Sequence, residues 1–141
     1  MRRTMDGVFV QLVWATWDRA PVLTDDLREA AFRLIGAKCH ALGADMLALN
    51  GVEDRVHLLV RLPTTLSIAT LMKEIKGSSG HAVAQLAMAD GRFFKWQGAY
   101  GAFSVSAHEL DTVVHYIKRQ TEHHANQSTL PYWELPPNPE R

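Results

Sequence analysis

Three things are scarce in this sequence, and each scarcity argues against a class of protein. The 141 residues hold one cysteine, Cys39, so an intramolecular disulfide and a cysteine-rich metal site are excluded. No apolar run approaches the ~18 residues that a membrane-spanning helix needs. Asp6 and Gln11 interrupt the segment after the basic start, which is therefore unlike a signal peptide. We expect a cytoplasmic protein with no membrane partner.

Net charge is the third scarcity, because 15 basic residues balance 15 acidic ones. The distribution is uneven: between Arg55 and Lys95, six basic residues stand against two acidic ones. A protein with a basic middle and an acidic periphery can bind a polyanion even though its net charge is zero. Ordinary surface charge explains the same pattern and, on this feature alone, is the simpler interpretation.

Hydrophobic residues are plentiful at 47%, enough to bury a sizeable core. We expect one domain over residues 1–141, with a core at about 7–125 and an irregular, proline-containing tail at 126–141. The period of the apolar residues predicts the elements. Strands are expected at 8–16, 45–52, 55–62 and 102–105. Helices are expected at 25–42, at 67–76 and from 106 to about 124.

The Gly77-Ser78-Ser79-Gly80 run is expected to break the second helix, with a short helical piece resuming near 82–88. The resulting order is β-α-β-β-α-β followed by one helix, which predicts an α+β, ferredoxin-like fold. We expect four antiparallel strands, with the third strand central and the helices packed on one face. A ferredoxin-like order does not by itself indicate a function.

The third predicted strand alternates in character. One face carries Val56, Leu58, Val60 and Leu62, and the other carries Arg55, His57, Leu59 and Arg61. Two cations and an imidazole on one face of a central strand call for a polar partner or a ligand. The alternative is a half-exposed polar sheet face, which is common in antiparallel sheets.

The last predicted helix starts at a capping box, Ser106 to Glu109, and carries Tyr116 on the flank of its apolar stripe. Gln120 follows one turn later, and Glu109 and His123 fall on the same side. The alternative is a tyrosine at the margin of the core. His123 and His124 equally suit a solvated helix end.

Five segments, in the same order and spacing, resemble the single-tyrosine transposases of the His-hydrophobic-His nuclease superfamily, found in bacterial insertion sequences and their repeat-associated relatives. They are Leu12–Thr16 with Arg19–Thr24, Asp54–Val60, Leu71–Ser79, Trp96–Ser106 and Tyr116–His124. The resemblance spans about Val10 to His124.

The resemblance implies a mechanism. Tyr116 matches the tyrosine that attacks single-stranded DNA, forms a 5′-phosphotyrosine link and releases a 3′-hydroxyl. The covalent link conserves the phosphodiester bond, so rejoining needs no ATP. A divalent metal, Mg2+ or Mn2+, assists because an ordinary tyrosine hydroxyl, with a pKa of ~10, is a poor nucleophile. His57 and Gln120 match two of its ligands.

Arg55 departs from the family, which has a histidine ligand there. Arginine has no acceptor and cannot ligate a cation. Either the metal is held weakly by His57, Gln120 and water, or Glu109, His123 or His124 helps. Arg55 can instead hold the scissile phosphate. The last alternative is that catalysis is lost and DNA binding kept.

DNA contacts are implied for part of the second helix and the segment after it. The matching residues are Lys73, Lys76, Ser78 and Ser79, with Lys95 near a displaced strand. Trp96 can stack on a base, although core packing is the simpler interpretation. The expected partners are single-stranded or hairpin DNA and a second copy of the chain, since family members are dimers.

The sequence therefore supports an active single-strand DNA transposase first. The second hypothesis, favoured by Arg55, is a catalytically weakened relative that binds hairpin DNA. The third is a ferredoxin-like domain that binds a small ligand or only oligomerises, and the five-segment resemblance disfavours it.

Overall fold

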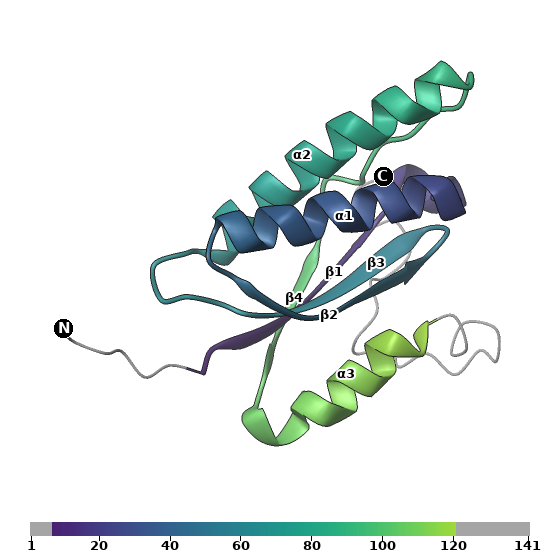
Figure 1. The fold of residues 1–141 in the computed structure, drawn as a ribbon. Coiled ribbons are helices and arrows are strands. Elements are labelled where there is room, and N and C mark those ends of the chain that lie inside the picture. Colours follow the sequence, from purple (N-terminus) through teal and green to yellow (C-terminus); the bar gives the residue numbers. More distant parts are fainter. Residues whose placement is uncertain (1–6, 121–141) are drawn as a thin grey trace.

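The computed structural model describes residues 7–120, which form a four-stranded antiparallel sheet and three α-helices (Figure 1). The strands lie in the order β2-β3-β1-β4. Their bounds are β1 Phe9–Ala15, β2 Asp45–Val52, β3 Arg55–Arg61 and β4 Gly101–Val105. The helices are α1 Asp25–Ala41, α2 Ile68–Ala89 and α3 Leu110–Lys118. The α+β, ferredoxin-like prediction is confirmed, with β3 inside the sheet.

The helices cover both faces of the sheet, so the prediction of a single helical face was wrong. Figure 1 shows α1 and α2 on one face and α3 on the other. The reason is that β3 buries side chains on both faces. Leu58 packs in the main core under α1 and α2, whereas its neighbour Leu59 packs with Val113 and Ile117 of α3. Period-2 alternation requires this when both residues are buried.

The face of the sheet toward α1 and α2 is the main hydrophobic core. Trp14 of β1 is fully buried there, and its ring meets that of Trp96 edge to face at 5.8 Å between centroids. The sheet side chains of this core are Val10, Leu12, Trp14, Val56, Leu58 and Val60. Burial of this size is the main stabilising term of the fold.

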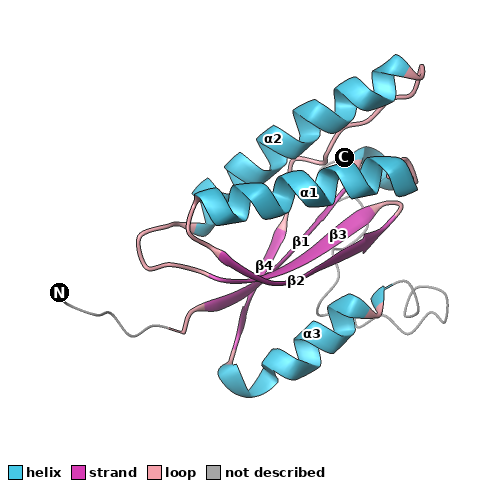
Figure 2. Ribbon diagram, viewed as in Figure 1, coloured by secondary structure: helices cyan, strands magenta, loops and turns pink. Residues whose placement is uncertain are grey.

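The second helix is continuous, so the predicted break at residues 77–80 was wrong (Figure 2). The small residues make room for Trp96: a Cβ on Gly80 would lie 2.9 Å from Trp96 Cδ1. The Trp96 indole donates to Ser79 Oγ at 3.1 Å, and that hydroxyl donates to the Ile75 carbonyl at 2.6 Å. The small residues at 77–80, which resemble a helix breaker in the sequence, therefore leave space on α2 for the Trp96 ring.

Helix starts were predicted with mixed success. Ser106 precedes a 3-10 turn, Ala107–Glu109, before α3 begins at Leu110. Its hydroxyl bonds the Glu109 carboxylate at 3.1 Å instead of accepting from a backbone N–H group, so the predicted serine cap does not form. The described part of α3 ends at Lys118, and the expected extension to His124 lies outside the described residues. Within residues 7–120, no helix is long and apolar enough to cross a membrane.

Candidate active site between the sheet and α3

Helix α3 is attached to the sheet by apolar contacts and by one polar side chain. Val113, Tyr116 and Ile117 are its buried residues, at the i, i+3, i+4 spacing of one helix face. Asn50 of β2 donates its amide to the carbonyls of Ile117 at 3.0 Å and Lys118 at 3.1 Å. These carbonyls belong to the last turn of α3, where no further helical N–H group is available to satisfy them. Asn50 therefore holds the tyrosine-bearing end of α3 on the sheet.

His57 lies directly beneath this helix end. It stands opposite Asn50 of β2 and Val13 of β1, and it is fully buried. Its ring meets the Tyr116 ring edge to face, with 6.0 Å between centroids. Tyr116 is 4% exposed, so it belongs to the buried stripe of α3 and not to its margin. The half-exposed sheet face considered from the sequence does not form, because α3 covers it.

Two glutamines complete the polar groups of this layer. Gln120, one turn after Tyr116, is fully buried. Gln11 of β1 is also fully buried, and its Nε2 lies 3.3 Å from His57 Nδ1. Gln11 Oε1 has no hydrogen-bond partner among the described residues. A buried polar atom left in this way costs about 1–3 kcal/mol, so its position here is noteworthy.

Arg55 is engaged with its neighbour in the chain. Its Nε donates to Asp54 Oδ1 at 3.2 Å and its Nη2 to Asp54 Oδ2 at 3.4 Å. The arginine side chain is only 12% exposed, and the aspartate offsets its charge. The guanidinium therefore lies at the hairpin end of β3, on the same strand face as His57.

The remaining candidates near the site fall elsewhere. Glu109 is exposed, in the turn before α3, and seven residues before Tyr116 is about 10 Å along a helix axis. The structure does not bring it to His57. His123 and His124 lie outside the described residues.

The residues expected to contact DNA divide into exposed and enclosed ones. Lys73 is exposed on α2, and Lys95 is exposed with its Nζ 4.5 Å above the Trp17 ring. Lys76 is half-buried and donates to the carbonyls of Gln97 at 2.5 Å and Ala99 at 3.3 Å, so it tethers the segment before β4. Ser78 is half-buried, and its hydroxyl lies 3.4 Å from the Ile75 carbonyl.

Ser79 is fully buried between α2 and Trp96, so a direct DNA contact would require that packing to open. Trp96 itself is 6% exposed, which confirms the core-packing interpretation.

The family model described as "Transposase IS200 like" matches residues 4–120. The chain belongs to the IS200-like transposase family. A crystal structure assigned as a transposase of Deinococcus radiodurans R1 is similar to it, with a TM-score of 0.68 and 24% identity, covering 85% of this chain and 95% of the other.

A REP-associated tyrosine transposase bound to a REP hairpin is similar at a TM-score of 0.66 and 16% identity, covering 88% of this chain and 72% of the other. These two likenesses show the shared fold. No curated protein matches the sequence.

In this IS200-like transposase, the donor set under α3 fits a hard or borderline divalent metal. His57 supplies an imidazole nitrogen and Gln120 an amide oxygen, donor types that suit Mg2+ or Mn2+. The unpartnered Gln11 Oε1 shows that oxygen acceptor capacity is left over beside His57. Among residues 7–120, no three histidine, cysteine or acidic side chains gather as a metal site.

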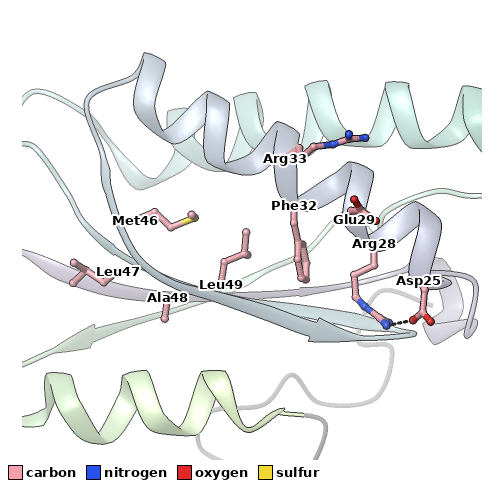
Figure 3. A pocket seen from close by; sticks show the side chains of 9 residues that line it. All are labelled: Asp25, Arg28, Glu29, Phe32, Arg33, Met46, Leu47, Ala48 and Leu49. Atoms are coloured by element: carbon pink, nitrogen blue, oxygen red, sulfur yellow. Dashed lines mark hydrogen bonds and ion pairs between the residues drawn. The ribbon is translucent and has the colours of Figure 1, made fainter.

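The transposase also has a surface hollow that Tyr116 does not line (Figure 3). It lies between α1 and β2, with Phe32, Met46 and Leu49 on its walls and the Asp25–Arg28 ion pair at one end. None of Tyr116, His57 and Gln120 lines it. Cys39 of α1 is no alternative nucleophile, because burial raises the pKa of its thiol to about 11.

Sequence reasoning missed Gln11 and Asn50. Gln11 is the one polar side chain in an otherwise apolar strand, and this contrast was the available signal. Asn50 carries no motif, and its role follows only from the pairing of β2 with β3 and from the position of α3.

Proposed function

We propose that this chain is a single-strand DNA transposase that cleaves and rejoins DNA through Tyr116. The observation that carries the proposal is the burial of Tyr116 against the His57 ring between α3 and the sheet, with Gln120, four residues later, also fully buried. Packing alone does not require a hydroxyl, an imidazole and an amide at these buried positions. Family membership indicates a transposase that acts on DNA.

In the proposed step, the Tyr116 hydroxyl loses its proton and attacks the phosphorus of the scissile phosphodiester. A phosphorus–oxygen bond to the tyrosine forms, the bond to the 3′ oxygen breaks, and that oxygen leaves as a 3′-hydroxyl after taking a proton. The 5′-phosphotyrosine link keeps the energy of the broken bond. Attack by another 3′-hydroxyl then rejoins DNA and releases Tyr116.

A divalent metal, Mg2+ or Mn2+, would neutralise charge on the phosphate in this step. We propose that His57 and Gln120 hold it. Arg55 cannot ligate a cation, but its guanidinium can donate to phosphate oxygens from the hairpin end of β3. His57 would then bind the metal and Arg55 the phosphate, at the two strand positions where the family has histidines.

The proposed substrate is single-stranded DNA beside a DNA hairpin. The REP-associated relative is bound to a REP hairpin, which supports a substrate of this class. Lys73 and Lys95 are exposed and available to phosphates, and Ser78 belongs with Lys73 to the family segment Leu71–Ser79. We also propose a homodimer, because Tyr116 is buried and α3 must leave its own sheet, or serve the sheet of a second copy, to receive a DNA phosphate.

The decisive experiment incubates the protein with single-stranded ends from its own genomic neighbourhood, with and without Mn2+ or Mg2+. A covalent protein–DNA adduct is expected with the parent and not with Tyr116→Phe. Phenylalanine keeps the ring that packs on His57, so folding and DNA binding should persist. An adduct that survives Tyr116→Phe would exclude the tyrosine mechanism.

A second candidate is a catalytically weakened relative that binds hairpin DNA, and Arg55 is the observation that favours it. Arg55→His separates the two. If arginine is a damaged ligand, histidine should raise Mn2+ affinity and adduct formation. If Arg55 holds the phosphate, the same change should lower adduct formation while hairpin binding remains.

A further inference from the structure

Gln11 and His57 form a side-chain pair across neighbouring strands. In the antiparallel register of β1 and β3, Gln11 stands opposite Leu59 and Val13 stands opposite His57. Gln11 is therefore a diagonal neighbour of His57 on the α3 face, within reach of long side chains. The 3.3 Å distance from Gln11 Nε2 to His57 Nδ1 and the complete burial of both residues show that the contact is made without water access.

This contact links an amide that can donate or accept to a ring with two distinct nitrogens. With the amide nitrogen facing Nδ1, Nδ1 accepts, and the proton of a neutral ring lies on Nε2. A ring in that state cannot bind a metal through Nε2. Gln11 Oε1 is meanwhile buried with no hydrogen-bond partner in residues 7–120. A half-turn of the amide brings this oxygen to Nδ1, where it can accept the proton that must then reside there.

The other amide beside His57 is already engaged. Asn50 stands opposite His57 on β2, but its nitrogen donates to the last carbonyls of α3 and its oxygen accepts from the Gly51 N–H group at 2.9 Å. Tyr116 meets His57 with its ring edge to face. Gln11 is thus the neighbour on β1 and β2 that retains acceptor capacity toward the imidazole.

We propose that Gln11 is a positioning residue that decides which ring nitrogen of His57 carries the proton, and hence whether Nε2 can bind a metal. The inference rests on the metal-binding part of the proposed function. Histidines that bind metals through one nitrogen donate the other N–H group to an oxygen acceptor, which fixes tautomer and ring orientation. Gln11 supplies that acceptor after the amide turns, and it supplies a donor while no metal is bound.

The first test reads the His57 tautomer directly, from ring 15N chemical shifts of the metal-free full-length protein. The parent should show an unprotonated Nδ1. An ionised Gln11→Glu carboxylate can only accept, and it should place a proton on Nδ1. Gln97→Met is the matched control, because Gln97 is another buried amide with an unpartnered side-chain nitrogen among the described residues. It should leave the His57 signals at the parent's values. A Gln11→Glu protein with Nδ1 still unprotonated would overturn the proposal.

The second test measures Mn2+ affinity from the electron paramagnetic resonance signal of free Mn2+. Gln11→Met fills a similar volume and cannot hydrogen-bond strongly, so its Mn2+ affinity should fall about tenfold or more, as for other outer-shell partners of metal ligands. Gln97→Met should bind as the parent does. If the parent binds Mn2+, a folded Gln11→Met protein that binds it equally tightly would overturn the proposal. This test holds even if the Gln11→Glu protein does not fold.

The two tests separate this inference from the proposed function. If the His57 proton follows residue 11 but neither parent nor variants bind Mn2+, the metal-dependent function is wrong and the tautomer control by Gln11 stands. If the parent binds Mn2+ but the His57 tautomer does not depend on residue 11, the tautomer control by Gln11 is wrong and the metal-dependent function stands.

Discussion

The two faces of the sheet come from the same strands and bury opposite kinds of side chain. Toward α1 and α2, β1 and β3 present Leu12, Trp14 and Leu58 to a large apolar core. Toward α3, the same strands present Gln11 and His57. Unsatisfied buried polar atoms are destabilising, whereas apolar burial is favourable. The first face can therefore maintain the fold while the second holds reactive groups in place.

The largest effect should come from truncating adjacent leucines that point to opposite faces. Leu58 and Leu59 are both fully buried in β3, so the two substitutions remove the same atoms. Leu58→Ala should destabilise near the top of the ~2–5 kcal/mol range for such changes, and Leu59→Ala near the bottom. The α3 cluster is smaller and includes half-buried members that can move into the space.

Urea unfolding of both variants measures the difference. Equal losses of unfolding free energy would show that the α3 face is packed as firmly as the face toward α1 and α2. The proposed difference between the two faces would then be wrong. A change in the urea dependence itself would indicate loss of two-state behaviour instead.

A smaller effect is expected from two glycines of α2. Gly80→Ala places a Cβ 2.9 Å from the buried Trp96 ring and should cost about 1–3 kcal/mol. Gly77→Ala meets nothing within 4 Å and should stabilise the helix by about 0.5–1 kcal/mol. Thermal melts of the two variants test whether the core between α2 and Trp96 has room for an added methyl group. A Gly80→Ala protein as stable as the parent would show that Trp96 yields easily.

Much of the apolar face could be predicted from the sequence. The two-residue separation at Glu53 and Asp54 predicts the hairpin of β2 and β3, and the alternation in the third strand predicts the interior place of β3. The continuity of α2 could not be predicted, because Gly77 and Gly80 destabilise an isolated helix and only the Trp96 contact compensates. That contact joins residues 17 apart in sequence, beyond the reach of local propensity.

The α3 face was less predictable for a related reason. Alternation places His57 opposite the main core, but it cannot tell an exposed polar face from one that a later helix covers. The covering helix is visible only once Leu59, Val113 and Ile117 are seen as one cluster. The roles of Tyr116, His57 and Gln120 remain predictions from the family resemblance, and the structure shows that all three are buried and that the Tyr116 and His57 rings meet.

Asn50 should control how firmly α3 rests on its face. Asn50→Ala removes two hydrogen bonds to the end of α3, together worth about 1 kcal/mol at a partly exposed site. Hydrogen exchange should accelerate in α3 and stay unchanged in α1, since α3 can open locally. Asn50→Asp keeps the shape but cannot donate, so it should loosen α3 at least as much. Equal acceleration in α1 and α3 would show that the faces do not open independently.

The smallest effect should be an acid dependence confined to the helical layer. Asp26, in the first turn of α1, accepts from Arg92 at 3.0 Å, and Arg92 also bonds Asp90 at 2.7 Å beyond the end of α2. The Arg92 hydrogen bond, with a further one from Thr24, holds the pKa of Asp26 well below its ordinary range. Because the folded pKa is lowered, the stabilisation is complete above the unfolded value of ~3.9 and is lost as pH falls toward the folded value.

Asp26→Asn should therefore lower the melting temperature slightly at neutral pH, and the gap to the parent should close below pH ~4. The Asp26 side chain is 65% exposed and that of Arg92 32%, so added salt should shrink the gap as well. The His57 ring signals should be the same in both proteins at neutral pH, because Asp26 and Arg92 belong to the α1–α2 layer and not to the α3 face. A gap that widens on acidification would contradict the sign of the Asp26 shift, and altered His57 signals would show that the two faces are coupled.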